Sequence, residues 1–245
     1  GESKIIIDKG AKPEDKPIWI EGPHIYSRNG FYYLMAAEGG TAEDHSEVVF
    51  RSKNILGPYK SYENNPILTQ RHLNSDRKNP ITSTGHADIL EDKFGNWWGV
   101  FLGCRPYDKN DHFNTGRETF MAPVKWIDNW PVFDLEGDVV KDKYTITVDK
   151  LIPDFSGINI TFKDDFNNEK LGFDWLFLRT PKEKWYSLLK GKLTINTRSE
   201  TTSGTSNPSF IGYRQKHLFG NVSTKLSFKT TSENEKAGLI AFQNE

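Results

Sequence analysis

Glu21 is a carboxylate set among apolar residues, in the segment IWIEGPHIY. A buried carboxylate without a partner is costly in free energy unless its charge is suppressed or used. Two roles fit this pattern. Glu21 could be a carboxylate at the start of a strand that accepts turn N–H groups, or it could supply one half of a reaction centre.

The segment around Glu21 recurs further along the chain. When EGPHIYSRNGFYYLMAAE is aligned with HADILEDKFGNWWGVFLG, Glu21 falls on His86. Each copy reads as a strand, a glycine-containing turn and an aromatic strand, which predicts a β-hairpin. Further strand patterns follow at 47–59 and 118–133. A unit of several antiparallel strands that repeats predicts blades of a β-propeller, and a sandwich with two similar hairpins is the alternative.

The inner strands of propeller blades face one central channel. We therefore expect Glu21, His86 and Asp88 to converge there, as the groups of a reaction centre must. For His86 the alternative is a histidine with satisfied hydrogen bonds in the protein core.

Arg117 lies in the segment GRET, after a polar stretch long enough to form a loop at the rim. Its guanidinium is a planar donor suited to paired hydroxyl groups or to a carboxylate. The alternative is a surface ion pair with Glu118 or Glu38. For Glu38 and His45, which lie in or beside a glycine-rich loop, we expect ordinary solvation.

Composition argues against several classes of function. A net charge of −1 gives no basic surface for nucleic acid, and no apolar run approaches the ~20 residues that a membrane span needs. The single cysteine, Cys104, excludes an internal disulfide and a multi-cysteine metal site, and we expect it to pack in the core. The histidines show no short metal-ligand spacing. Neither a phosphate-binding glycine loop nor a nucleophile elbow occurs.

The pattern divides the chain into three parts. Residues 1–140 carry the blade-like repeats, 141–162 read as a linker, and 163–245 start a different β-pattern that is typical of a sandwich. In that last part we expect turns at Asn167-Asn168 and Lys190-Gly191, and alternating strands through 209–230. The first residues, GESKIIIDKG, lack the layout of a signal peptide, and the sequence assigns no compartment.

These motifs resemble those of glycoside hydrolase family 43, the β-xylosidases and α-L-arabinofuranosidases. The resemblance rests on EGPHIYSRNGFYYLMAAEGGT, VVFRSKNILGPY, NPILT, GHADIL, GNWW and GRET in this order. The later segments DDFNNEKLGFDWLFLRTP, WYSL and AGLIAFQN are similar to the β-sandwich of the xylosidase branch. The fold implied is all-β: the last blades of a five-bladed propeller, followed by part of a concanavalin-like sandwich.

The resemblance also implies a chemistry. Family members hydrolyse terminal xylosyl or arabinofuranosyl residues with inversion, using a carboxylic acid and a carboxylate base. The glutamate of EGPH is the family's general acid, which corresponds to Glu21, and its pKa would be raised by burial and a nearby negative charge. His86 and Arg117 match substrate-binding residues. The expected partner is a xylo- or arabino-oligosaccharide, with no cofactor. Calcium would fit a propeller channel, but no acidic loop in the sequence indicates it.

The sequence departs from the family pattern in one respect. The general-base aspartate and a second aspartate that tunes the acid have no counterpart in these 245 residues. We therefore expect this chain alone to be inactive and to need the rest of the propeller, from the same protein or from another chain. A non-catalytic carbohydrate-binding β-protein is the alternative. A fructan-cleaving propeller is a third hypothesis, and the EGPH context argues against it.

Overall fold

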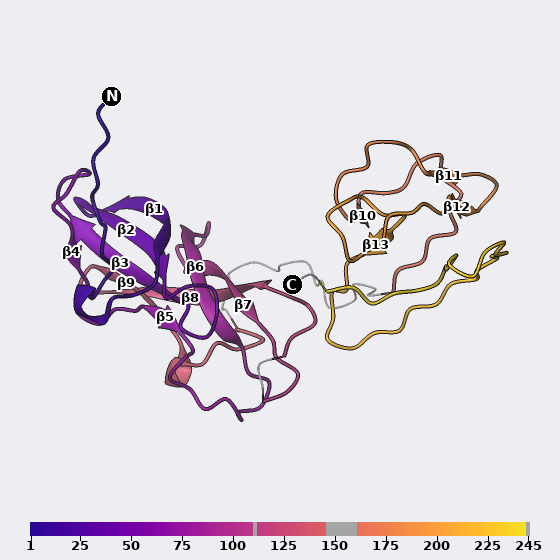
Figure 1. The fold of residues 1–245 in the computed structure, drawn as a ribbon. Helices are drawn as coiled ribbons and strands as arrows, with labels where there is room; N and C mark the ends of the chain where they lie inside the picture. The colour runs from indigo at the N-terminus through magenta and orange to yellow at the C-terminus, as the bar shows by residue number, and fades with distance from the viewer. Residues whose placement is uncertain (110–111, 146–160, 244–245) are drawn as a thin grey trace. The chain divides into compact units, whose positions relative to one another are not determined.

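The computed structural model describes residues 1–109, 112–145 and 161–243. The chain divides into two compact units, Gly1–Lys150 and Leu151–Glu245 (Figure 1). Within the described ranges the helices are two single 3-10 turns, η1 (Pro13–Asp15) and η2 (Glu136–Asp138). In these ranges no helix has the length and apolar character needed to cross a bilayer. Of the predicted linker 141–162, residues 146–160 lie outside the described part.

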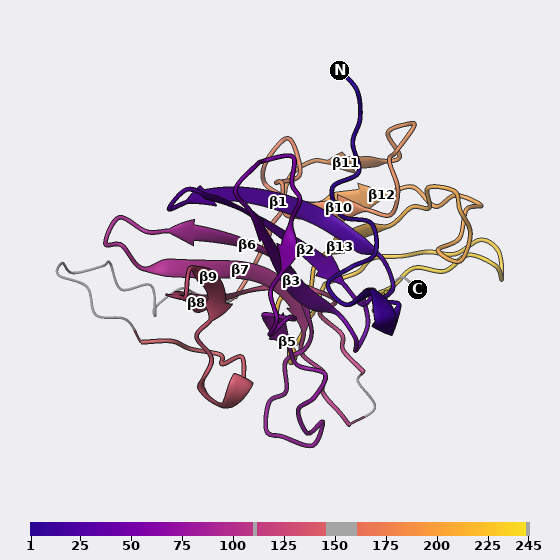
Figure 2. The same cartoon turned by 90° about the vertical axis from the view of Figure 1, so that its left-hand side faces the viewer.

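The first unit contains two antiparallel sheets (Figures 1 and 2). In the first sheet neighbouring strands follow chain order, and β5 also pairs with β3: β1 (Ile20–Arg28), β2 (Phe31–Glu38), β3 (Ser46–Ser52), β4 (Lys60–Ser61) and β5 (Leu68–Thr69). The second sheet has the same order: β6 (Thr82–Glu91), β7 (Trp97–Cys104), β8 (Glu118–Ile127) and β9 (Trp130–Phe133). The two predicted hairpins, β1–β2 and β6–β7, are confirmed.

Local sequence explains the first hairpin. Asn29 and Gly30 join β1 to β2, and both have positive φ, 50° and 75°. A two-residue turn with this backbone matches the right-handed twist of the strands, and Asn-Gly is its preferred sequence. The turn sets the register in which Arg28 faces Phe31 and His24 faces Met35, and beyond a bulge Glu21 faces Ala37.

A shared apolar core holds the two sheets face to face. Tyr33, Met35 and Val49 of the first sheet belong to the same buried cluster as Phe101 and Phe133 of the second. Burial of this apolar surface is the main favourable term for the packing. Cys104 is also buried, as expected.

Asn65 provides hydrogen bonds that the strand ladder does not supply. Its amide is 3% exposed, donates to the Val49 carbonyl (2.8 Å) and accepts from the Val49 N–H (2.9 Å). We expect Asn65→Leu to lower the free energy of unfolding by about 2 kcal/mol, because the buried Val49 N–H loses its acceptor, whereas the Val49 carbonyl keeps the Tyr62 N–H at 3.1 Å. Urea unfolding measures this. The matched control, Asn64→Leu at an exposed position, should change it by less than about 0.5 kcal/mol, and equal losses would contradict the assignment.

The second unit has short strands in two pairs. These are β10 (Trp175–Phe177) with β13 (Ile211–Tyr213), and β11 (Tyr186–Leu188) with β12 (Leu193–Ile195). Lys190 and Gly191 form the predicted turn between β11 and β12, with positive φ at both residues. The chain bends at 168–170, close to the predicted Asn-Asn turn.

The predicted run of strands through 209–230 is wrong in this structure, because β13 is the one strand assigned there. Val222, Leu226 and Phe228 lie at alternating positions, on what would be one strand face, but are 77%, 55% and 41% exposed. An alternating segment becomes a strand when a neighbouring strand completes its hydrogen bonds and another layer covers its apolar face. Neither is present for these residues in the described part of the unit.

Candidate active site

Glu21 is the second residue of β1, and the pairing of β1 with β2 shifts register immediately after it. The bulge between Glu21 and His24 contains Gly22, which has φ +58°. The Glu21 side chain is exposed, so the predicted burial is wrong in this structure. The physical reason is that β1 is an edge strand with β2 as its partner, and no second layer covers the Glu21 carboxyl in the described residues.

His86 lies in the corresponding strand of the second sheet, in a still more irregular backbone. The pairing of β6 with β7 shifts register twice, between Thr82 and Gly85 and between Gly85 and Asp88. His86 itself has φ +56°, a conformation that costs free energy in a residue other than glycine and is often found at functional sites. His86 is the fifth residue of β6, and not the first as the repeat suggested.

The imidazole of His86 lies against the Glu21 segment. A Cβ atom built on Gly22 would stand 2.2 Å from His86 Nε2, so the ring occupies the space that any side chain at Gly22 would need. The structure therefore brings the predicted acid and the predicted sugar-binding histidine together across the seam between the two sheets.

Arg117, just before β8, is exposed and belongs to the same neighbourhood. The charges of His86, Arg117 and Glu21 all act on the imidazole of His45. The alternative expected for Arg117 is an ion pair with Glu118. In the structure Arg105 donates to both carboxylate oxygens of Glu118 at 2.7 Å. All three predicted site residues thus lie close enough to His45 for their charges to influence its imidazole.

His45 is buried, 1% exposed, which differs from the loop solvation expected from sequence. Its Nδ1 lies 2.9 Å from the Ser83 carbonyl oxygen and must carry the proton, since a carbonyl oxygen accepts. Burial, with the charges of His86 and Arg117, lowers the pKa of the imidazole. His45 is therefore a neutral side chain that holds the backbone of β6 from the neighbouring sheet.

Glu47 is a second buried group behind the site. It is 0% exposed, and its Oε2 accepts the N–H of Ala87 at 2.8 Å. The nearby backbone N–H of His86 also favours the charged form of this carboxyl, while Oε1 has no hydrogen-bond partner in the described residues. Burial raises the pKa of Glu47 well above its ordinary value, which favours the neutral acid.

The pKa of Glu47 predicts a pH dependence of stability. The folded state keeps its proton at pH values where the unfolded chain has lost it, so this group's stabilising contribution is greatest below the ordinary pKa of 4.5 and falls as pH rises. Glu47→Gln removes the titration. We expect the unfolding free energy of the variant, relative to wild type, to increase from about pH 5 to about pH 8. Urea unfolding at several pH values measures this, and parallel profiles would contradict it.

Asp88, expected to converge with Glu21 and His86, bonds instead to the side chains of β1. Its Oδ1 lies 2.9 Å from His24 Nδ1 and accepts the Tyr26 hydroxyl at 2.9 Å. The Tyr26 oxygen in turn accepts the N–H of Ile89. These bonds tie β1 to β6 beside the candidate site.

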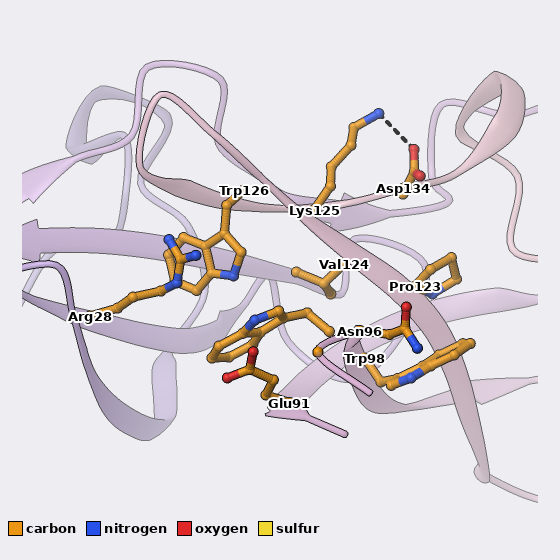
Figure 3. A pocket seen from close by; sticks show the side chains of 11 residues that line it. Arg28, Glu91, Asn96, Trp98, Pro123, Val124, Lys125, Trp126 and Asp134 are labelled. Atoms are coloured by element: carbon orange, nitrogen blue, oxygen red, sulfur yellow. Dashed lines mark hydrogen bonds and ion pairs between the residues drawn. The ribbon is translucent and has the colours of Figure 1, made fainter. Parts of the chain in front are cut away.

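A separate hollow of about 450 Å³ lies at the other end of β1 (Figure 3). Arg28, the last residue of β1, stacks its guanidinium on Trp126 at 4.3 Å, with Trp97 edge-on to the same indole. The hollow contains none of the predicted site residues. Among the described residues, no group of three or more His, Cys, Asp or Glu could hold a metal ion.

Comparisons with known proteins identify the family of the chain. The sequence model of glycosyl hydrolases family 43 matches residues 1–131, and that of the β-xylosidase C-terminal concanavalin A-like domain matches 163–245. The chain belongs to glycoside hydrolase family 43. Its two sheets are thus blades of the family's β-propeller, and the second unit corresponds to the family's β-sandwich.

Several family 43 proteins resemble the chain throughout. A non-reducing end α-L-arabinofuranosidase of Bacteroides ovatus is 40% identical over 90% of this chain and 41% of its own length. A xylosidase/arabinosidase of Butyrivibrio fibrisolvens is 38% identical over 98% of this chain and 46% of its own length. The crystal structure of a family 43 protein from a capybara gut metagenome superposes with a TM-score of 0.72 at 43% identity, over 87% of this chain and 40% of that one. The chain thus spans less than half the length of these relatives.

Proposed function

We propose that the full-length protein containing this chain is an inverting glycosidase. It removes terminal xylosyl or arabinofuranosyl residues from hemicellulose oligosaccharides, with Glu21 as general acid and His86 and Arg117 as sugar-binding residues. Residues 1–140 supply propeller blades, 141–162 a linker and 163–245 the accessory sandwich. The observation that carries the proposal is the His86 imidazole packed on Gly22, beside Glu21, within the segment that the family 43 model matches.

The chemistry follows from this placement. The Glu21 carboxyl gives its proton to the glycosidic oxygen as the bond from that oxygen to the anomeric carbon breaks. A water molecule attacks the anomeric carbon from the opposite face and loses its proton to a carboxylate base. In inverting enzymes the two carboxyl groups stand ~6.5–9.5 Å apart to admit the water. In this proposal the base comes from the part of the protein outside these 245 residues.

His86 and Arg117 would bind the terminal sugar. Imidazole nitrogens and a guanidinium fork are suited to hydroxyl groups, and both side chains are exposed, that of His86 against Gly22 next to Glu21. The relatives named above are an arabinofuranosidase and a xylosidase/arabinosidase, which supports both terminal sugars as substrates.

The test is hydrolysis by the full-length protein of an aryl β-xyloside and an aryl α-L-arabinofuranoside. Proton NMR of the first-formed sugar reads the configuration of the product. We expect turnover of at least one substrate, with inverted product. Retained configuration would refute the inverting mechanism. Absence of hydrolysis, combined with xylo-oligosaccharide binding that survives Glu21→Gln, would refute the enzyme and support a carbohydrate-binding protein.

A further inference from the structure

We propose that Glu47 is the positioning residue that sets His86 in the sugar site. It acts from strand β3 of one blade through the backbone of β6 in the next. The inference rests on the proposed function, and it assigns a role to a carboxyl that does not itself reach the exposed face where Glu21 lies.

The contacts of Glu47 are directed at one point of β6. Its carboxyl accepts the N–H of Ala87 at 2.8 Å, and the N–H of the adjacent residue, His86, lies close to it. The side chain is fully buried, and the next two residues of β3, Val48 and Val49, are apolar. A carboxyl in such surroundings is costly unless its hydrogen bonds are needed there.

Strand β6 needs such support because its own ladder is interrupted. Both register shifts with β7 fall between Thr82 and Asp88, and Ser83 and His86 have positive φ, 52° and 56°. Strained residues of this kind persist when surrounding structure fixes them. His45 holds the Ser83 carbonyl at 2.9 Å, and Glu47 holds the N–H of Ala87, next to His86, at 2.8 Å. Two side chains of one neighbouring blade thus fix both ends of the irregular segment.

The position of the His86 ring depends on this backbone. The ring lies against Gly22, where a Cβ atom would stand 2.2 Å from Nε2, so the fit leaves little freedom. When the N–H of Ala87 loses its acceptor, the strained φ of the adjacent His86 loses its support and the ring moves away from the Glu21 segment. Displacements of about 1 Å in positioned groups can lower activity by about 10²-fold.

The test uses the full-length protein and three substitutions at this position. Glu47→Leu should lower kcat/KM for the better aryl glycoside by about 10²-fold, mainly through KM, because His86 binds substrate. Glu47→Gln keeps a carbonyl acceptor and should stay within about 3-fold of wild type. If Glu47→Leu does not fold, Glu47→Asp, which withdraws the carboxyl from β6, should show the loss.

A double-mutant cycle separates positioning from general structural damage. In the His86→Ala background, Glu47→Leu (or Glu47→Asp) should lower kcat/KM by less than about a further 3-fold, because the imidazole that Glu47 positions is already absent. Glu38→Leu is the matched control. Glu38 is also a buried glutamate and accepts a backbone N–H, from Ala11 at 2.9 Å. If Glu38→Leu lowers kcat/KM, its effect should be independent of His86. The fold-losses of Glu38→Leu and His86→Ala should then multiply in the double variant.

The outcomes are distinct. Suppose that the wild type hydrolyses a glycoside. If Glu47→Leu is then fully active, or if its loss of activity multiplies with that of His86→Ala, this inference alone is overturned. A wild type that hydrolyses neither glycoside overturns the proposed function and, with it, the role of Glu47. Rescue by Glu47→Gln together with a non-additive cycle supports the inference.

Discussion

Glu21→Gln in the full-length protein should lower kcat for xylobiose by about 10³-fold and kcat for an activated aryl xyloside by less than about 10-fold. The amide has the size of the carboxyl but donates no proton to the leaving oxygen. A sugar alkoxide needs that proton to depart, whereas a nitrophenolate leaves without it. The ratio of the two losses therefore reports general acid catalysis directly. Steady-state kinetics with both substrates measures it.

Two comparisons make the result specific. Glu14→Gln, at an exposed position in η1, changes charge in the same way and should leave both rates near wild type. If Glu21→Gln reduced both rates equally, Glu21 would act in binding or folding, and the acid assignment would be refuted.

Gly22→Ala should lower kcat/KM by at least about 10²-fold. The new Cβ would stand 2.2 Å from His86 Nε2 and 2.8 Å from two ring carbons, so the imidazole must leave its place beside Glu21. The substitution also forces alanine to adopt φ +58°, which costs about 1 kcal/mol in stability. Kinetics and urea unfolding together separate the two effects.

Gly30→Ala is the matched control for this substitution. Gly30 has φ +75°, and a Cβ there meets nothing within 4 Å. It should show a similar loss of stability, about 1 kcal/mol, with activity close to wild type. If Gly30→Ala impaired activity as severely as Gly22→Ala, backbone strain would explain both losses, and the contact with His86 would have no part in them.

The sequence predicted the hairpins well because their signals are local. Asn29-Gly30 and the alternation of β1 and β2 depend on neighbouring residues, and the resemblance of the second segment to the first predicted β6 and β7. The repeat also predicted that the segments of Glu21 and His86 lie close together, since inner strands meet in a propeller, and the His86 ring lies against Gly22.

Glu47 and His45 could not be found in this way. In sequence, Glu47 is the polar residue at the start of an apolar strand, and His45 ends a loop. Their burial arises from packing between sheets that are far apart in sequence, which strand periodicity does not report. The same reason explains the opposite error at Glu21, whose apolar neighbours suggested burial although β1 is an edge strand.

The most direct measurement is a crystal structure of the full-length Glu21→Gln variant with a bound xylo- or arabino-oligosaccharide. We expect the side chain of residue 21 within hydrogen-bond distance of the glycosidic oxygen, with His86 and Arg117 in contact with the terminal sugar. A sugar seated elsewhere, for example in the hollow that Arg28 and Trp126 line, with residue 21 out of reach of its glycosidic oxygen, would contradict this expectation.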